Sequence, residues 1–182
     1  MNKKKVIALI SKSIGITLYQ DIDGSSWLSN GYALYNMGKF PHCESEDEVA
    51  SVLGLNEKQA AGTKITISDH FPFARGTMKL ITGLFPVSFS IKTAGRTLYI
   101  LTNGNLSVAV AVDETYLKPF VMSDEVSYNA YAYGDHIALL EVCYGMINVG
   151  YICPYRLDSD HIDKMLKTIS ALPTEVSEDV QL

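Results

Sequence analysis

The residue types that most often do chemistry are few in this chain and widely separated. His42 and Cys43 are neighbours in the sequence, and adjacent side chains cannot by themselves orient as a base and a nucleophile toward each other. The pair follows a proline, so we expect it in an exposed loop. If the protein were a small cysteine or histidine hydrolase, Cys43 would be the best candidate nucleophile, because an accessible thiol is the reactive kind.

A second candidate is the run Ser68-Asp69-His70, which contains the three residue types of a hydrolytic triad. Successive side chains on an extended chain point in different directions. A triad is defined by the geometry between its members, which consecutive residues do not supply. We therefore interpret this run as a turn before Phe71 and Pro72.

Metal and cofactor motifs are absent from the sequence. The histidines and cysteines show neither a His-x-x-x-His nor a Cys-x-x-Cys spacing, and the glycines form no phosphate loop or dinucleotide fingerprint. Asp21 and Asp23 stand beside Gly24, where carboxylates are typical of turns. Glu141 lies in an alternating strand pattern and is expected to face outward. The sequence thus predicts no cofactor and favours a non-enzymatic protein, although catalytic groups assemble in space rather than in sequence.

The most basic part of the chain is its start, which carries Lys3, Lys4, Lys5 and Lys12. Apolar residues at helical spacing predict a short amphipathic helix over residues 3–13. Lys5 and Lys12 are seven residues apart and share one face of it. The opposite, buried face is expected to hold Val6, Ile10 and Ile14. Two interpretations stay open: a solvated N-terminal turn, or contact with nucleic-acid phosphates.

Composition limits the class of protein. The chain has 182 residues, of which 47% are hydrophobic and 19% charged, a profile typical of folded domains. The net charge of −5 argues against nucleic-acid binding by the whole outer surface but allows a local basic patch. Cys143 and Cys153 lie in apolar runs, which predicts two buried thiols in a reducing compartment. No apolar run is long enough to span a membrane, so we expect a cytoplasmic protein with no membrane partner.

The hydrophobic pattern predicts an α+β fold of two packed units of mainly antiparallel strands with short helices. The units are expected over residues 1–86 and 87–172, followed by a flexible acidic tail over residues 173–182. Strands are expected at residues 16–22, 26–37, 64–68, 87–101 with an interruption at 94–96, 127–133, 136–144 and 148–153, with one more between the turn at Asn103-Gly104 and the helix that follows. Helices are expected at 3–13, 45–54, 113–120 and 158–172. Asn30-Gly31 marks a turn or a bulge. Residues 71–73 and 84–86 are expected to be loops anchored by buried aromatic rings.

Several local signals support these helices. Ser45 followed by Glu48 is typical of a capping box, with Val49, Val52 and Leu53 expected on the buried face of the helix. Ile162, Met165, Leu166 and Ile169 form one apolar stripe in the last helix.

Tyrosines are the remaining signal. Tyr131 and Tyr133 share one face of their strand, and Tyr128 lies on the other. Such residues are good strand formers, and aromatic side chains are also enriched at protein interfaces.

The second unit resembles the closing repeat of bacterial DNA sliding clamps. The resemblance rests on Tyr116-Leu117 in a short helix, on the three strands that follow, and on the ending Cys-Pro-Tyr-Arg-Leu at residues 153–157. Cys153 and Tyr155 depart from the methionines of that family, the last helix continues past the point where a clamp ends, and one chain supplies fewer repeats than a ring needs. The resemblance implies a DNA-clamp-like fold.

The same resemblance implies a function. It predicts a non-enzymatic protein associated with double-stranded DNA and replication partners, which meets phosphates through the lysines of the first helix. Tyr151, Cys153 and Tyr155 would then lie where clamps receive a short peptide of a partner protein. Residues 27–35 also resemble short uncharacterised proteins of bacteriophages and mobile elements of anaerobic bacteria. Open strand edges predict self-association; the alternative is a monomeric adaptor that binds a protein through its tyrosine-rich face.

Overall fold

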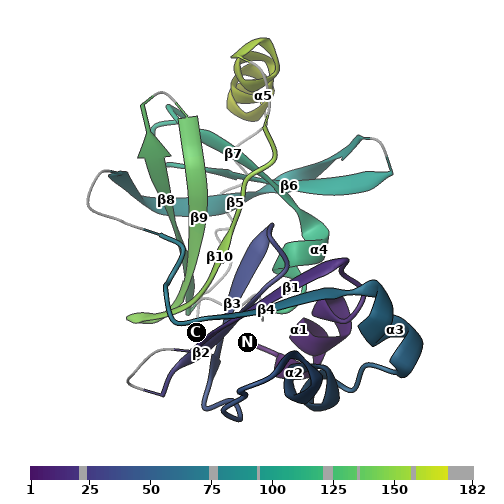
Figure 1. The fold of residues 1–182 in the computed structure, drawn as a ribbon. Helices are drawn as coiled ribbons and strands as arrows, with labels where there is room; N and C mark the ends of the chain where they lie inside the picture. The colour runs from purple at the N-terminus through teal and green to yellow at the C-terminus, as the bar shows by residue number, and fades with distance from the viewer. Residues whose placement is uncertain are drawn as a thin grey trace, which may run out of the picture.

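A computed structural model describes residues 1–20, 24–73, 78–93, 95–120, 125–134, 136–156 and 159–171 (Figure 1). Ten strands form one sheet in the order β4-β1-β2-β3-β10-β9-β8-β5-β6-β7. In chain order the strands are β1 (Gly15–Gln20), β2 (Ser26–Ser29), β3 (Ala33–Gly38), β4 (Lys64–Ser68), β5 (Lys79–Thr93), β6 (Arg96–Thr102), β7 (Ala109–Asp113), β8 (Val126–Tyr133), β9 (His136–Tyr144) and β10 (Ile147–Ile152). The helices are α1 (Lys3–Ile10), α2 (Glu46–Leu53), α3 (Glu57–Gly62), α4 (Glu114–Leu117) and α5 (Ser159–Ala171).

The strand pairing confirms the expected mixed fold with mainly antiparallel strands. Among the described residues β1 and β4 pair in parallel, and the other neighbouring strands pair antiparallel. Asn30 and Gly31 form a turn between β2 and β3: Gly31 has φ +85°, and the Asn30 side-chain oxygen accepts from the backbone N–H groups of Tyr32 and Ala33. A positive φ costs glycine little. The turn expected at Asp23-Gly24 lies partly outside the described residues.

Local capping explains where the helices begin. Asn2 and Ser45 cap α1 and α2 through side-chain oxygens that accept from the backbone N–H three residues on, which satisfies donors that the helix leaves free. The Glu48 carboxylate, however, accepts from the N–H of Glu44 rather than from that of Ser45, so the expected capping box is displaced by one residue. Asn56 begins α3 with a full capping box, and this short helix was not predicted.

Two apolar residues that were expected to be buried are exposed. Ile14, expected on the buried face of the first helix, is 87% exposed. The reason is that α1 ends at Ile10 with Ser11 as its C-cap, so Ile14 no longer follows the helical repeat. Val52 is also exposed, because α2 turns Val49 and Leu53 inward instead.

The core of the first half lies between the sheet and the helices. Val6 and Ile10 of α1, together with Val49 of α2, pack against buried residues of β1 to β3 such as Leu18 and Leu28. Figure 1 shows α1, α2 and α3 grouped beside this part of the sheet. Burial of these side chains is the main force that holds α1 in place, because an isolated helix of this length is unstable in water.

The second half of the sheet curls back toward its own beginning. Residues just after β10 reach the edge strand β7, where the Tyr155 N–H donates to the Ala111 carbonyl at 2.8 Å. Leu117 and Phe120, at the end of α4, pack inside the curl. On the other side, α5 lays its apolar stripe over β6 and β7, as expected from the sequence. In Figure 1 α5 lies at the top of the molecule.

Strand β5 departs from the expected pattern. It runs from Lys79 to Thr93 and includes residues 84–86, which were expected to form a loop over buried rings. Leu84 is buried, whereas Phe85 is 45% exposed. The strand tolerates Pro86 because its pairing with β6 shifts register between Pro86 and Ser90, and proline is accepted at such irregularities. Residue 86, the expected boundary between units, therefore lies within a strand that pairs with both β8 and β6.

None of the described helices is both long and apolar enough to cross a membrane. The tail expected over residues 173–182, like the N-cap region of α5 at residues 157–158, lies outside the described residues.

Candidate functional site

The basic start of the chain forms an exposed surface on α1. Lys3, Lys4 and Lys5 are exposed on the helix. Lys12 is exposed too, but α1 ends at Ile10, so the expectation that Lys5 and Lys12 share one face of a helix is wrong. Val6 and Ile10 anchor the opposite side in the core, so the lysine side chains face solvent. No acidic residue lies within α1, and nothing in the helix itself neutralises this charge. We call these four lysines the basic face.

Asn2, just before α1, contacts the second half of the chain. The Asn2 N–H donates to the Pro119 carbonyl at 2.7 Å, which joins the start of α1 to the turn that follows α4. Lys118 is exposed there, and its ammonium lies 3.5 Å from the Glu114 carboxylate. A surface pair of this kind contributes little to stability.

The residues that were expected to bind partner proteins are partly buried and partly exposed. Tyr151 is 1% exposed, whereas Cys153 and Tyr155 reach solvent. The backbone N–H of Cys153 donates to the Tyr32 carbonyl at 2.8 Å, which holds the chain against the start of β3. The partner-binding role stays a prediction, and the accessible residues for it begin at Cys153, not at Tyr151. Cys153 was expected to be buried, which is wrong because β10 ends at Ile152.

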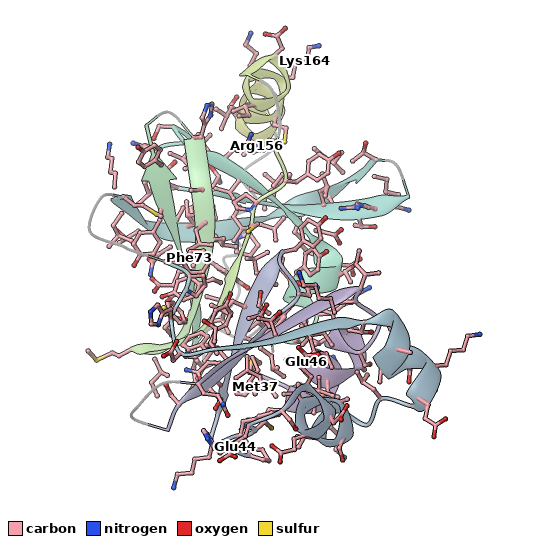
Figure 2. All side chains as sticks on the ribbon, in the orientation of Figure 1. Met37, Glu44, Glu46, Phe73, Arg156 and Lys164 are labelled. Atoms are coloured by element: carbon pink, nitrogen blue, oxygen red, sulfur yellow. The ribbon has the colours of Figure 1, made fainter. Side chains whose placement is uncertain are left out.

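A cavity of about 170 Å³ lies beside this stretch. Its walls come from residues 109–111 of β7, His136 and Ile137 of β9, residues 154–156, and Ile162 of α5. Figure 2 shows Arg156 just below α5. No sequence signal pointed to His136 here, because the approach of β7 to this end of the β9–β10 hairpin depends on the whole sheet.

Cys43 does not have the environment of a nucleophile. It is 1% exposed, its Sγ lies 3.4 Å from the Pro41 carbonyl oxygen, and its backbone N–H and C=O are both held by the Gln20 amide. Burial, and then the nearby Glu48 carboxylate, raise the pKa of this thiol. The expectation of an exposed loop at Cys43 is therefore wrong: the side chain fills the core beneath α2. A raised pKa leaves little reactive thiolate at neutral pH.

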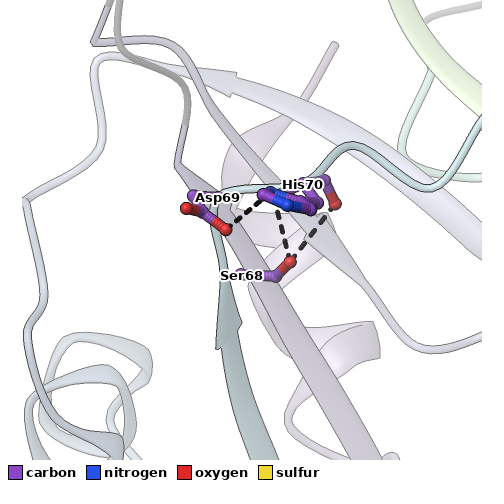
Figure 3. Close-up of polar contacts among 3 residues, drawn as sticks. All are labelled: Ser68, Asp69 and His70. Atoms are coloured by element: carbon purple, nitrogen blue, oxygen red, sulfur yellow. Dashed lines mark hydrogen bonds and ion pairs between the residues drawn. The ribbon is translucent and has the colours of Figure 1, made fainter.

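The run Ser68-Asp69-His70 forms a turn, as expected (Figure 3). The Ser68 hydroxyl accepts from the His70 backbone N–H at 3.1 Å and lies 3.2 Å from its carbonyl oxygen. The His70 Nδ1 lies 2.7 Å from the Asp69 Oδ1, and both side chains are more than 80% exposed. The serine does not contact the imidazole, so the three residues lack the geometry of a triad.

Glu141 is the residue whose environment the sequence did not predict. It was expected to face outward, but it is 6% exposed. Its carboxylate accepts from the side-chain amides of Asn129 and Asn148 and lies within 3.4 Å of the hydroxyls of Tyr131 and Tyr151. Multiple donors are what a buried carboxylate requires. The expectation failed because this face of the sheet is covered by a segment from far away in the sequence.

That cover is a cluster of aromatic rings. Phe71 and Phe73, which follow β4, pack their rings against Tyr151 with centroids 6.1 and 5.5 Å away, and Trp27 stacks on Tyr151 at 5.8 Å. Phe73 is labelled beside this part of the sheet in Figure 2. Phe71 remains 38% exposed, so its expected burial is only partial. The ring cluster shields the hydrogen-bond network around Glu141 from water. This network forms a small polar core.

The tyrosines of β8 do not form an exposed row. Tyr128 is buried in the main core, Tyr131 is buried beside Glu141, and Tyr133 is 66% exposed. Burial raises the pKa of Tyr128 to about 12. Within the described residues no group of three His, Cys, Asp or Glu side chains could hold a metal ion.

Comparison of the chain with protein-family models, with curated proteins and with solved structures found no match.

Proposed function

We propose that this protein is a non-enzymatic, sliding-clamp-like protein of a phage or mobile element that associates with double-stranded DNA and with replication partners. The observation that carries the proposal is the basic face. Lys3, Lys4 and Lys5 are exposed on a helix with no acidic residue of its own, and Lys12 is exposed two residues past its end. A few exposed lysines close together in the chain give weak, sequence-independent binding to phosphates that depends strongly on salt.

The position of α4 supports the same proposal. The hydrogen bond from Asn2 to Pro119 joins the start of α1 to the turn after α4, the first helix of the second half, and the clamp resemblance implies phosphate contacts through the first helix. The acidic residues of α2, Glu46 to Glu48, gather in its first turn, and Glu44 and Glu46 lie at the α2 end of the molecule (Figure 2). The net charge of −5 would discourage DNA elsewhere on the surface.

Self-association belongs to the proposal because strand edges that are left open must be covered or paired. The two edges of the sheet are β4 and β7, and Tyr155 already bridges to β7. Strand β4 thus offers the more open edge for pairing with a second copy. Sedimentation velocity over a range of concentrations tests this: a species that stays monomeric up to high micromolar concentration removes self-association and favours the monomeric adaptor.

The DNA proposal is tested by fluorescence anisotropy with a labelled duplex at low salt. The test variant is Lys5→Glu with Lys12→Glu, which reverses two charges of the basic face. The matched control is Lys92→Glu with Lys167→Glu, which makes the same change in net charge at exposed positions on β5 and α5. Binding that the test variant loses and the control keeps supports the proposal; equal binding by all three proteins, or none, contradicts it.

A further inference from the structure

The cavity between β7, β9 and α5 has the composition of a site for a negatively charged group. Arg156 and His136 line it, and no aspartate or glutamate does among the residues that the structure describes. Neither side chain has an ion-pair or hydrogen-bond partner among the residues that the structure describes, and both are exposed. Asp160, in the first turn of α5, does not line the cavity. Within the described part of the chain, no acidic side chain competes with a ligand for these two nitrogen-bearing groups.

The other walls are apolar and narrow. Ala109 and Ala111 face α5 from β7, and their small side chains leave the space that larger residues would fill. Ile137, Pro154 and Ile162 complete these walls. At about 170 Å³ the cavity is smaller than the roughly 300–1,000 Å³ of typical cofactor or drug sites. It has room for one aliphatic side chain and a small charged group.

The wall that carries Arg156 is held in position by the sheet. The Tyr155 N–H donates to the Ala111 carbonyl at 2.8 Å, and this bond fixes the chain immediately before Arg156. A fixed chain lowers the entropic cost of ordering a side chain on binding. The planar guanidinium can then donate two parallel hydrogen bonds to a carboxylate, a geometry that a lysine cannot match.

We propose that this cavity binds a carboxylate of a short peptide, with an aliphatic group seated against Ala109, Ala111 and Ile162. The proposal refines the partner-binding part of the proposed function by naming the chemistry of the partner. It concerns a different surface from the basic face of α1. Small carboxylates test it in the absence of DNA and of any partner protein, so either proposal can fail while the other stands.

The test uses full-length protein labelled with nitrogen-15 and three small probes. N-acetyl-leucine carries a terminal carboxylate, N-acetyl-glutamic acid α-amide carries a side-chain carboxylate, and N-acetyl-leucinamide is the neutral match of the first. We expect N-acetyl-leucine to shift the amide signals of residues 109–111, 137 and 162 with millimolar affinity. Because a hydrogen bond to a charged group contributes strongly, the neutral amide should bind at least about tenfold more weakly.

Variants locate the contact. Arg156→Gln should weaken N-acetyl-leucine binding by about tenfold or more, while the control Lys92→Gln should leave it unchanged. Both residues are exposed, so neither change should unfold the protein, and unchanged amide spectra without ligand check this. Tighter binding of the glutamic acid probe would assign the carboxylate to an acidic side chain; tighter binding of N-acetyl-leucine would assign it to a chain terminus. Equal binding of the neutral amide, shifts confined to other residues, or an unaffected Arg156→Gln variant would overturn the proposal.

Discussion

The backbone N–H of Asn2 donates to the carbonyl of Pro119 across 2.7 Å, so the first residues of the chain are held by the turn after α4. The same Asn2 caps α1 through its side chain, which accepts from the Lys5 N–H at 3.1 Å. One residue therefore both begins the basic helix and docks it on the second half of the molecule. The orientation of the basic face depends on this residue.

Loss of the Asn2 cap should destabilise the protein. Asn2→Ala removes the side-chain acceptor but keeps the backbone bond to Pro119, and it should lower the free energy of unfolding by about 0.5–2 kcal/mol. Asn2→Asp keeps an acceptor and serves as the control. Urea denaturation followed by circular dichroism measures both. A loss of the same size in the aspartate variant would show that the cap is not the cause.

Gly150 should not tolerate a side chain. A Cβ there would lie 2.5 Å from the Phe120 ring and 2.9 Å from the Leu34 carbonyl oxygen, both closer than real contacts allow. Gly150→Ala should therefore cost about 1–3 kcal/mol of stability, as overpacking does. Gly15→Ala is the matched control, because a Cβ at that position meets nothing within 4 Å. Adding Phe120→Leu should restore part of the loss; no restoration would place the strain elsewhere.

Replacement of Glu141 should lower the free energy of unfolding, because its role is structural. Glu141→Gln places an amide donor among the donors of Asn129, Asn148, Tyr131 and Tyr151. At least one buried group then loses its partner, at a cost of about 1–3 kcal/mol. Thermal and urea denaturation measure it. The exposed Glu57→Gln is the control, and equal stability of the two variants would contradict a role for the network.

The three thiols should differ in reactivity. Cys153 reaches solvent while Cys43 and Cys143 are buried, so iodoacetamide should modify Cys153 first. Burial raises the pKa of the Cys153 thiol; since the thiolate is the reactive form, its labelling rate should still rise with pH above the ordinary value of about 8.5. Mass spectrometry of digests measures the order, with urea-unfolded protein as the control. Modification of Cys43 before Cys153 would contradict the structure.

Much of the local structure follows from short-range signals. Strand β4 and the start of α2 are found where residues 64–68 and Ser45 predict them, because alternation and capping act over a few residues. Residues 84–86 and Glu141 were placed wrongly for one reason: their environments depend on partners far away in the chain. Strand β5 is long because it pairs with both β8 and β6, and no local pattern contains that information.

The candidate sites also differ in whether short-range sequence signals predict them. The exposed lysines of α1 were predictable, since the helical repeat alone turns Lys5 away from Val6 and Ile10. The cavity that joins His136 to Arg156 was not, because β9 and the residues after β10 meet β7 only once the sheet has curled. Cys43 is the opposite case. Its position after Pro41 predicted an exposed surface loop, but the core of the fold covers its side chain.

The most direct test of the central claim is the salt dependence of duplex DNA binding. The logarithm of the association constant should fall linearly with the logarithm of salt concentration, with a slope of about −0.9 for each phosphate contact. If Lys5 and Lys12 each meet a phosphate, reversing both charges should make the slope shallower by roughly two units, while Lys92→Glu with Lys167→Glu leaves it unchanged. Wild-type protein that fails to bind at low salt, or equal slopes for all three proteins, would contradict DNA binding through the basic face.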